Sequence, residues 1–148
     1  INCPGQIVIS GARDGLTQAI DLAKERGPHR PIPLPVSGAF HTPLMQSAFD
    51  GMVETVATLS FDQPVTPVIA NTTAQPLTTA ELIKEELLGQ LCHCIHWQGS
   101  IEYMVNKGVT TFIEIGPGKV LTGLIKRINR EVKTLNIGDA QAIKNLAG

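Results

Sequence analysis

Short runs of apolar, mostly β-branched residues alternate along this chain with longer segments in which apolar residues recur at helical spacing. Residues 6–10 (Gln-Ile-Val-Ile-Ser) predict a short buried strand, and residues 12–26 predict the helix that follows it. Alternation of this kind is typical of α/β proteins, in which helices cover both faces of a largely parallel sheet. The sequence therefore predicts a layered α/β core.

The alternation continues toward the C-terminal end. Further helices are predicted at 43–59, from Thr78 or Thr79 to about Leu91, and at 97–106, 120–129 and 139–147, and further strands at 65–70, 110–115 and 134–137. Residues 31–36 are also predicted to be extended, but they carry three prolines at alternate positions. Because proline cannot donate to a ladder, this segment is predicted to be a sheet edge or a connector.

These elements divide the chain into two parts. Residues 1–36 form a β-α-β pattern that is too small to fold alone, and they are predicted to be the tail of a small subdomain. Residues 37–148 are predicted to belong to the larger α/β core. Only about three strands of its main sheet can be identified, and a parallel sheet needs cover on both faces. The rest of the sheet is therefore expected from sequence outside this chain.

The composition excludes several classes of protein. The chain has 148 residues, with 12 Lys and Arg against 13 Asp and Glu and a net charge of -1. A nucleic-acid-binding protein needs a basic face that neutralises several phosphates, so nucleic acid is not an expected partner. Three cysteines do not make a disulfide framework and favour a reducing, cytoplasmic location. No apolar run approaches the roughly 18 residues of a membrane-spanning helix, so no membrane is expected either.

His41 is the first candidate for chemistry. It follows Gly38-Ala-Phe on a loop between an extended segment and the start of a helix, where functional groups are common. A histidine at such a place is suited to general base catalysis, because imidazole titrates near neutral pH. On the spacing alone, a surface histidine without a chemical role is the more frequent case.

The run Cys92-His93-Cys94-Ile95-His96 is dense in side chains that bind metals. In an extended segment Cys92, Cys94 and His96 share one face. A structural zinc site, however, needs four ligands with enough loop between two pairs to turn, and no second pair follows. We therefore expect no metal site here and favour buried cysteines beside Trp97, with a zinc-binding module as an alternative.

Two other features suggest anion binding only weakly. Gly116-Pro-Gly-Lys119 lacks the four-residue spacer and the Ser or Thr of a phosphate-binding loop, so a tight turn from strand to helix is favoured. Amides at the start of that helix could still meet an anion. Arg30, next to His29, could hold a phosphate, and the basic residues within 126–130 suit the negative end of a helix.

A nucleophile is missing from the sequence. The chain contains no Gly-x-Ser-x-Gly elbow, the turn that presents the reactive serine in hydrolase-like folds. A general base without a nucleophile is half of a catalytic site.

Four blocks of sequence are informative when taken together. They are Asn2-Cys-Pro-Gly-Gln6 with Ile7-Val-Ile-Ser-Gly11, Leu34-Pro-Val-Ser-Gly-Ala-Phe-His41-Thr-Pro-Leu-Met45, Gln90-Leu91 ahead of Trp97, and Glu114-Ile-Gly-Pro-Gly-Lys-Val-Leu-Thr-Gly-Leu-Ile-Lys-Arg127. In this order they resemble bacterial malonyl-CoA:acyl carrier protein transacylases. The resemblance covers nearly the whole chain and matches the C-terminal half of that family.

The resemblance implies a hydrolase-like α/β core that carries a ferredoxin-like small subdomain. Residues 1–36 would be the C-terminal part of the subdomain, and residues 37–148 the C-terminal part of the core.

The resemblance also implies ping-pong acyl transfer in fatty acid biosynthesis. A serine takes a malonyl group from malonyl-CoA and passes it to the phosphopantetheine thiol of acyl carrier protein. The implied partners are malonyl-CoA, acyl carrier protein and the N-terminal half of the same protein. Coenzyme A thioester is a substrate, and no cofactor is permanently bound.

The resemblance also assigns roles to individual residues. His41 matches the catalytic base, and the backbone carbonyl of Gln90 would accept its other imidazole N–H in place of a triad carboxylate. Phe40 would fill the space that an α-methyl branch needs, so malonyl is expected over methylmalonyl. Arg30 matches a basic surface position that faces the phosphate of the coenzyme or carrier. Asn2 and Gln6 match positions that, in this family, line the cleft between the two subdomains.

The sequence departs from the family pattern in two respects. Cys94 replaces the usual proline between the Gln-Leu pair and the Trp, which leaves the backbone near Gln90 less constrained. The nucleophilic serine, the arginine that holds the malonyl carboxylate and the oxyanion-hole segment are absent from these residues. The chain by itself is therefore expected to be inactive.

Two alternatives remain beside the zinc-binding module. A malonyl-specific acyltransferase of a polyketide synthase would use the same chemistry. A non-catalytic module that binds the acidic carrier protein would need a basic patch around Arg30 or Arg127, and it would tolerate loss of His41.

Overall fold

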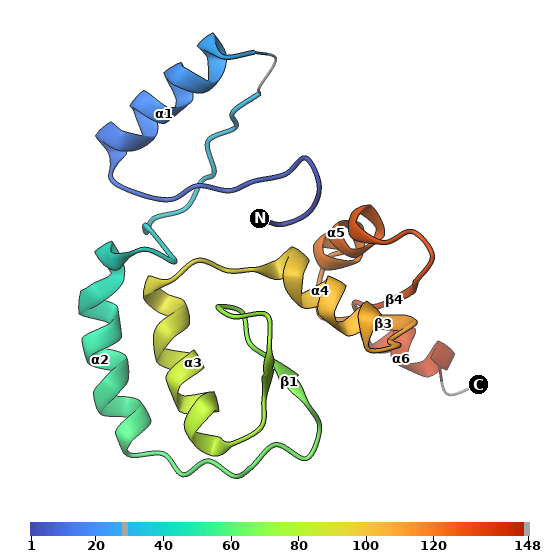
Figure 1. The fold of residues 1–148 in the computed structure, drawn as a ribbon. Coiled ribbons are helices and arrows are strands. Elements are labelled where there is room, and N and C mark those ends of the chain that lie inside the picture. Colours follow the sequence, from blue (N-terminus) through green and yellow to red (C-terminus); the bar gives the residue numbers. More distant parts are fainter. Residues whose placement is uncertain (28–29, 147–148) are drawn as a thin grey trace. The chain divides into compact units, whose positions relative to one another are not determined.

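The computed structural model describes residues 1–27 and 30–146 (Figure 1). The chain divides into two compact units. The first unit contains Ile1–Ile7, Thr73–Gln75 and the chain from His96 onward, and the second contains Val8–Thr72 and Pro76–Ile95. No helix in the described ranges is both long and apolar enough to cross a membrane. His29 lies outside these ranges.

The first unit is built on a parallel strand pair. Its elements are α4 (Trp97–Asn106), β3 (Thr111–Ile115), α5 (Val120–Ile128), β4 (Lys133–Ile137) and α6 (Ala140–Leu146). The strands pair from Thr111 opposite Lys133 to Ile115 opposite Ile137. Parallel neighbours need a crossover connection, and α5 supplies it.

The core of this unit lies where α4 and α5 meet β3. Ile101, Ile125 and Val132 are at most 4% exposed, and Phe112 is among the partly buried side chains that pack against them. Burial of one such aliphatic side chain stabilises a fold by about 1.5–3 kcal/mol. The side chains of β3 alternate, so Ile113 points away from this core and is 53% exposed.

The second unit is mainly helical. Its elements are α1 (Arg13–Glu25), the 3-10 turn η1 (Pro43–Met45), α2 (Gln46–Ala57), β1 (Val68–Ile69), β2 (Pro76–Leu77) and α3 (Ala80–Cys92). Helix α2 packs against α3. Thr79 caps α3 by accepting a hydrogen bond from the amide of Leu82 at 3.3 Å. The backbone amide of Glu81 and the Thr79 hydroxyl lower the pKa of the Glu81 carboxyl.

The helices predicted from periodicity are present. Helix α4 has the predicted bounds, and Gly108, with a φ of 89°, follows its C-terminal end. The two strands predicted nearest the C-terminus are also present, as β3 and β4. Residues 31–36 form no ladder, which agrees with the connector interpretation.

One strand prediction is wrong and a second is confirmed only in part. Residues 6–10 form no strand beyond a single bridge between Gln6 and Cys3. Ile7, Val8 and Ile9 are 69%, 47% and 58% exposed, because no described segment pairs with these three residues. The strand predicted at 65–70 is reduced to β1 and pairs antiparallel with β2. The connection between these strands is too short for the crossover that parallel pairing requires. The fold is therefore α/β with one small parallel and one small antiparallel sheet in the described residues.

Candidate active site

His41 is held at the C-terminal end of α3 by two hydrogen bonds. Its backbone amide donates to the carbonyl oxygen of Leu91 at 3.1 Å, and its Nδ1 lies 2.6 Å from the carbonyl oxygen of Gln90. Carbonyl groups in the last turn of a helix have no partner within the helix, so they are available to this loop. The φ of His41 is 63°, a left-handed conformation that costs an L-residue about 1–2 kcal/mol. The two hydrogen bonds offset this cost.

The way in which α3 ends leaves these carbonyls free. His93 takes an extended conformation directly after Cys92, and both its backbone amide (3.1 Å) and its Nδ1 (2.7 Å) contact the carbonyl oxygen of Gly89. Gly89 therefore holds the end of the helix. The next two carbonyls, those of Gln90 and Leu91, face His41.

The contact with Gln90 determines the protonation pattern of the imidazole. A carbonyl oxygen only accepts hydrogen bonds, so the proton of the neutral ring lies on Nδ1 and the lone pair lies on Nε2. No hydrogen bond to Nε2 comes from the described part of the chain, and His41 is exposed. No carboxylate within residues 1–27 and 30–146 forms an ion pair with His41; the ion pair in these ranges joins Lys24 to Asp21. The ring is arranged to accept a proton at Nε2.

Two residues that the sequence analysis did not select are connected to Gln90. The side-chain Nδ2 of Asn71 donates to Gln90 Oε1 at 2.9 Å. Glu86 Oε1 accepts from the amides of Asn71 (2.7 Å) and Thr72 (3.1 Å), and its Oε2 accepts from the Thr72 hydroxyl at 2.5 Å. The available sequence signal was the spacing of Glu86 and Gln90, four residues apart on one helix face, together with an Asn-Thr turn after a strand.

Phe40 packs over a glycine. A Cβ built on Gly38 would lie 3.1 Å from Phe40 Cε2 and 3.2 Å from Cζ, which is tighter than an ordinary contact. The Phe40 ring can take this position because residue 38 is a glycine and has no side chain to collide with it. The Phe40 side chain is 45% exposed and directly precedes His41.

Asn2 and Gln6 are brought together by a tight turn in the first unit. The Gln6 amide donates to the carbonyl of Cys3 at 2.9 Å, with Pro4 and Gly5 at the two central positions. Gly5 has a φ of 78°, as the third position of a type II turn requires. The Asn2 amide in turn donates to the Gln6 carbonyl at 3.1 Å. His41, Gln90, Phe40 and Arg30 belong to the second unit.

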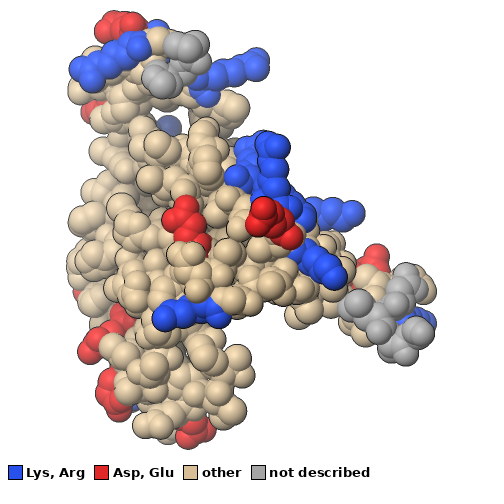
Figure 2. Space-filling view, turned by 45° about the vertical axis from the view of Figure 1, so that its right-hand side comes forward, with Lys and Arg blue, Asp and Glu red and all other residues tan. Residues whose placement is uncertain are grey.

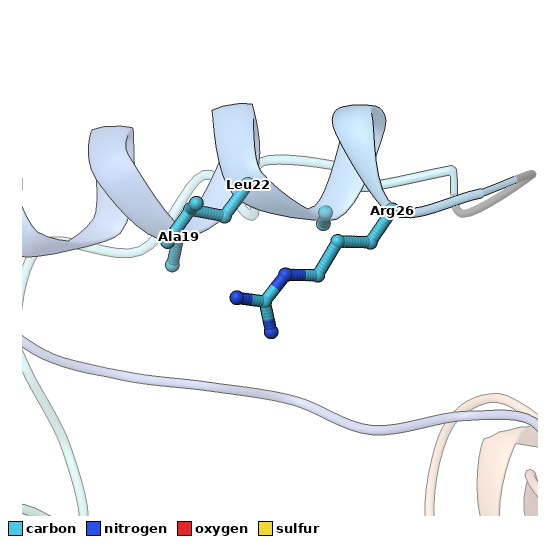
Figure 3. Close-up of a pocket in the computed structure, with 4 residues that line it drawn as sticks. Ala19, Leu22 and Arg26 are labelled. Atoms are coloured by element: carbon cyan, nitrogen blue, oxygen red, sulfur yellow. The ribbon is translucent and has the colours of Figure 1, made fainter.

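Arg30 is exposed. A surface hollow in the same unit is a different feature, lined by Ala19, Leu22 and Ala23 of α1 and by Arg26, which directly follows the helix (Figure 3). The labelled side chains point to the same side of the helix, and α1 has no buried residue. A site that encloses a ligand draws its lining from several elements, so this hollow is the open apolar side of α1 and not a ligand pocket.

The run Cys92-His93-Cys94-Ile95-His96 does not have the extended geometry that would place Cys92, Cys94 and His96 on one face. Cys92 is the last residue of α3 and is buried, whereas Cys94 is exposed, so the run is not one extended segment. The expectation that the cysteines are buried therefore holds for Cys92 but not for Cys94. No group of three His, Cys, Asp or Glu side chains in the described ranges comes together to hold a metal ion.

The segment Gly116-Pro-Gly-Lys119 is the predicted turn between β3 and α5. Its suggested anion site is already occupied by the protein itself, because Glu114 accepts from the amides of Leu121 (3.0 Å) and Thr122 (2.9 Å). The Thr122 side chain and the Thr122 amide, followed by the Leu121 amide, lower the pKa of Glu114. The carboxylate of Glu114 therefore takes the place of an external anion at the start of α5.

In a comparison with solved structures, the fold of this chain is similar to that of acyltransferases. An acyl carrier protein S-malonyltransferase of Vibrio cholerae aligns with 99% of this chain and 48% of its own chain, with a TM-score of 0.92 and 40% identity. A malonyl-transacylase solved in complex with a type II PKS acyl-carrier protein aligns with 98% of this chain and 47% of its own, with a TM-score of 0.91 and 34% identity.

The curated relatives that match this chain share one enzyme name. The malonyl CoA-acyl carrier protein transacylase of Bacillus subtilis (strain 168) is 46% identical over 144 residues, which is 97% of this chain and 45% of that protein. No protein-family model matches the chain. The chain is thus homologous along nearly its whole length to malonyl CoA-acyl carrier protein transacylases, and it spans about half the length of the curated relatives it matches.

Proposed function

We propose that this chain is the C-terminal half of a malonyl-CoA:acyl carrier protein transacylase and that His41 is its general base. The observation that carries the proposal is the contact of 2.6 Å between His41 Nδ1 and the Gln90 carbonyl oxygen, which leaves Nε2 as a proton acceptor. Its support from comparison is the 46% identity over 144 residues to a malonyl CoA-acyl carrier protein transacylase.

The first half of the proposed reaction transfers malonyl to the enzyme. A serine hydroxyl in the N-terminal half attacks the thioester carbonyl of malonyl-CoA while Nε2 of His41 takes its proton. The resulting imidazolium returns this proton to the coenzyme A thiolate when the C–S bond breaks. Coenzyme A leaves as the thiol, and the malonyl group is left as a serine ester.

The second half transfers malonyl to the carrier. His41 Nε2 takes the proton of the phosphopantetheine thiol, and the thiolate attacks the ester carbonyl of the malonyl-serine. The C–O bond of the ester breaks, and the imidazolium returns the proton to the serine oxygen. The base is neutral again and the cycle is closed.

Gln90 has the orienting role that a carboxylate performs in a Ser-His-Asp triad. Its carbonyl oxygen holds the N–H on Nδ1, so the same tautomer is present before each proton transfer. The hydrogen bond also stabilises the imidazolium through the partial negative charge of the carbonyl. No ionised partner for His41 is required by this arrangement.

Substrate contacts are proposed for four further residues. The ring of Phe40, directly before His41, would exclude an α-methyl branch and so favour malonyl over methylmalonyl. Arg30 would meet a phosphate of the coenzyme or of the phosphopantetheine arm. Asn2 and Gln6 would line the substrate cleft, where their shared turn fixes them relative to each other.

Exposed apolar side chains support the proposal that an N-terminal half completes the fold. Ile113, Ile115 and Leu135 are 53%, 79% and 43% exposed on one face of the β3–β4 pair. Uncharged residues cover most of the face drawn in Figure 2. Parallel sheets are ordinarily covered on both faces, so further strands and helices would be expected to cover these residues. In this proposal residues 37–148 belong to a hydrolase-like core and residues 1–36 to a ferredoxin-like subdomain.

Fatty acid biosynthesis in the cytoplasm is the proposed setting, with malonyl-CoA and acyl carrier protein as partners. A polyketide pathway is the second candidate. It is favoured by one observation, the TM-score of 0.91 with a malonyl-transacylase solved together with a type II PKS acyl-carrier protein. Transfer rates to carrier proteins of the two pathways would separate the candidates.

Intact mass spectrometry of the complete protein tests the proposed function. Incubation with malonyl-CoA is expected to add one malonyl group to a peptide outside this chain, and acyl carrier protein is expected to remove it. His41→Ala in the complete protein is expected to slow both steps. If His41→Ala left transfer unaffected, the base assignment would fail and a non-catalytic carrier-binding role would be favoured.

A further inference from the structure

The turn after β1 is connected to the catalytic histidine through a series of hydrogen bonds that the proposed reaction does not itself use. We propose that Asn71 and Glu86 are positioning residues, which hold the Gln90 carbonyl where it orients the His41 ring. This inference rests on the proposed function for its kinetic consequence. The structural part of it, the effect of Asn71 and Glu86 on the imidazole, is testable independently of transfer.

The first link is the side-chain amide of Asn71. Its Nδ2 donates to Gln90 Oε1 at 2.9 Å, and both side chains are partly buried. Gln90 is therefore held at two points, by Asn71 through its side chain and by His41 through its carbonyl. The Asn71 amide makes no recorded contact with His41 itself, so any effect on the imidazole passes through Gln90.

The second link is the carboxylate of Glu86. It accepts three hydrogen bonds, from the amides of Asn71 (2.7 Å) and Thr72 (3.1 Å) and from the Thr72 hydroxyl (2.5 Å). Two successive amides that converge on one oxygen fix the backbone of the turn, and hence the direction in which the Asn71 side chain points. Hydrogen bonds to a carboxylate are stronger than those between neutral groups, so these three contacts hold the turn firmly.

Glu86 and Gln90 lie four residues apart and so project from the same side of α3. Together they attach the last turns of α3 to the turn at residues 71–72. This attachment matters because the terminal turn of a helix frays easily, and α3 ends only two residues after Gln90. Without the attachment, the Gln90 carbonyl would be free to move away from His41.

The expected consequence is a change in the imidazole and not in substrate binding. A small displacement of a catalytic group costs much rate, on the order of a hundredfold for 1 Å. We expect Asn71→Leu, which removes the amide at similar volume, to lower kcat about tenfold and to change the KM for malonyl-CoA by less than about twofold. A residue with only a general stabilising role would not produce this separation of kcat from KM.

The test uses the intact protein that contains this chain, labelled with ¹⁵N at histidine. The His41 signals are identified by their loss in His41→Asn. In the wild type we expect a protonated Nδ1 whose proton exchanges slowly with water. In Asn71→Leu and in Glu86→Leu we expect this exchange to become at least about tenfold faster and the Nε2–H tautomer to become populated.

Two matched variants control for loss of folding. Glu86→Gln keeps an oxygen for the two amides and can donate to the Thr72 hydroxyl, so it is expected to restore the slow exchange that Glu86→Leu removes. Glu85→Leu changes the exposed neighbour on the same helix and is expected to leave the signal unchanged. Circular dichroism of each variant identifies any that does not fold. Asn71→Leu is the milder of the two changes, because residue 71 keeps its backbone N–H as a donor to Glu86.

The outcomes separate the two proposals. If Asn71→Leu and Glu86→Leu both keep a slowly exchanging Nδ1 proton and a normal kcat, the positioning role is wrong. If the wild type shows no protected Nδ1 proton, the inference also fails. If His41→Asn retains full transfer activity, the proposed function fails, whereas the imidazole signal of Asn71→Leu still decides whether Asn71 positions the ring.

Discussion

The backbone amide of His41 donates to the carbonyl oxygen of Leu91 at 3.1 Å, and this contact ties a residue of positive φ to the end of a helix. The contact uses the main chain, so it survives replacement of the side chain. The backbone geometry and the imidazole chemistry of His41 can therefore be tested by different substitutions.

His41→Ala and His41→Asn are expected to differ in stability but not in activity. Both remove the imidazole that is proposed as the general base, so malonyl transfer by the complete protein should fall about a hundredfold or more. Asparagine tolerates a φ of 63° better than alanine, so only His41→Ala should lose about 1 kcal/mol of unfolding free energy. Transfer assays and urea denaturation check the two parts. Equal stability of the variants would contradict the backbone argument.

Phe40 is expected to control the choice of acyl group. Phe40→Ser in the complete protein should raise the ratio of kcat/KM for methylmalonyl-CoA over malonyl-CoA by about 10- to 200-fold, the range typical of one methyl group in a pocket. Gly38→Ala should shift the ratio in the same direction by less, because its Cβ would meet the ring at 3.1 Å and displace it. Gly51→Ala, at a glycine with open space around it, is the matched control. An unchanged ratio in Phe40→Ser would remove the steric role.

Glu114 is expected to make stability depend on pH in the acid range. Hydrogen bonds from Thr122 and Leu121 lower the pKa of the Glu114 carboxyl in the folded state below its ordinary value. A carboxyl with a lowered folded pKa stabilises the fold above its unfolded pKa, and this contribution is lost as the pH falls through the folded pKa. Glu114→Gln should therefore lower the Tm at pH 7, and its difference from the wild type should shrink below about pH 4.5.

Thermal unfolding at a series of pH values from neutral to acid measures this effect. Glu131→Gln, which removes an exposed carboxylate near β4, is the control and should change the Tm little at any pH. A Tm difference for Glu114→Gln that stays constant across the acid range would show that the carboxylate charge is not what stabilises α5.

The three cysteines are expected to differ in reactivity. Cys94 is exposed, whereas Cys3 and Cys92 are buried, so a thiol reagent should label only Cys94 in the folded chain. Denaturation should expose the other two. Peptide mass spectrometry after labelling identifies the positions, and protection of Cys94 that is reversed by a chelator would instead favour a zinc-binding module.

Local periodicity was sufficient to predict the helices and the strands β3 and β4, but not the strands nearer the N-terminus. Helix α4 follows from apolar spacing and from Gly108, both of which are read within a few residues. Whether residues 6–10 form a strand depends on a neighbour elsewhere, and the described chain contains none. The antiparallel pairing of β1 could have been anticipated, because the connection to β2 leaves no room for a crossover.

The site was predictable in part for similar reasons. The motif around His41 and the position of Gln90 came from resemblance, and the structure records the hydrogen bond between them. Asn71 and Glu86 carry no motif and become visible only when the turn and α3 are seen together. Glu114 lies seven residues before Leu121, so its cap on α5 depends on the conformation of the intervening turn.

Two isoleucines of the first unit separate the core of this chain from the surface that the proposed N-terminal half would cover. Ile101 is 1% exposed, so Ile101→Ala should cost about 2–5 kcal/mol of unfolding free energy in this chain and in the complete protein alike. Ile113 is 53% exposed, so Ile113→Ala should cost less than about 1 kcal/mol in this chain alone. If an N-terminal half covers β3, Ile113→Ala should become markedly more costly in the complete protein. Urea denaturation of both variants in both forms makes the comparison, and an equally small cost of Ile113→Ala in the two forms would show that this face stays open.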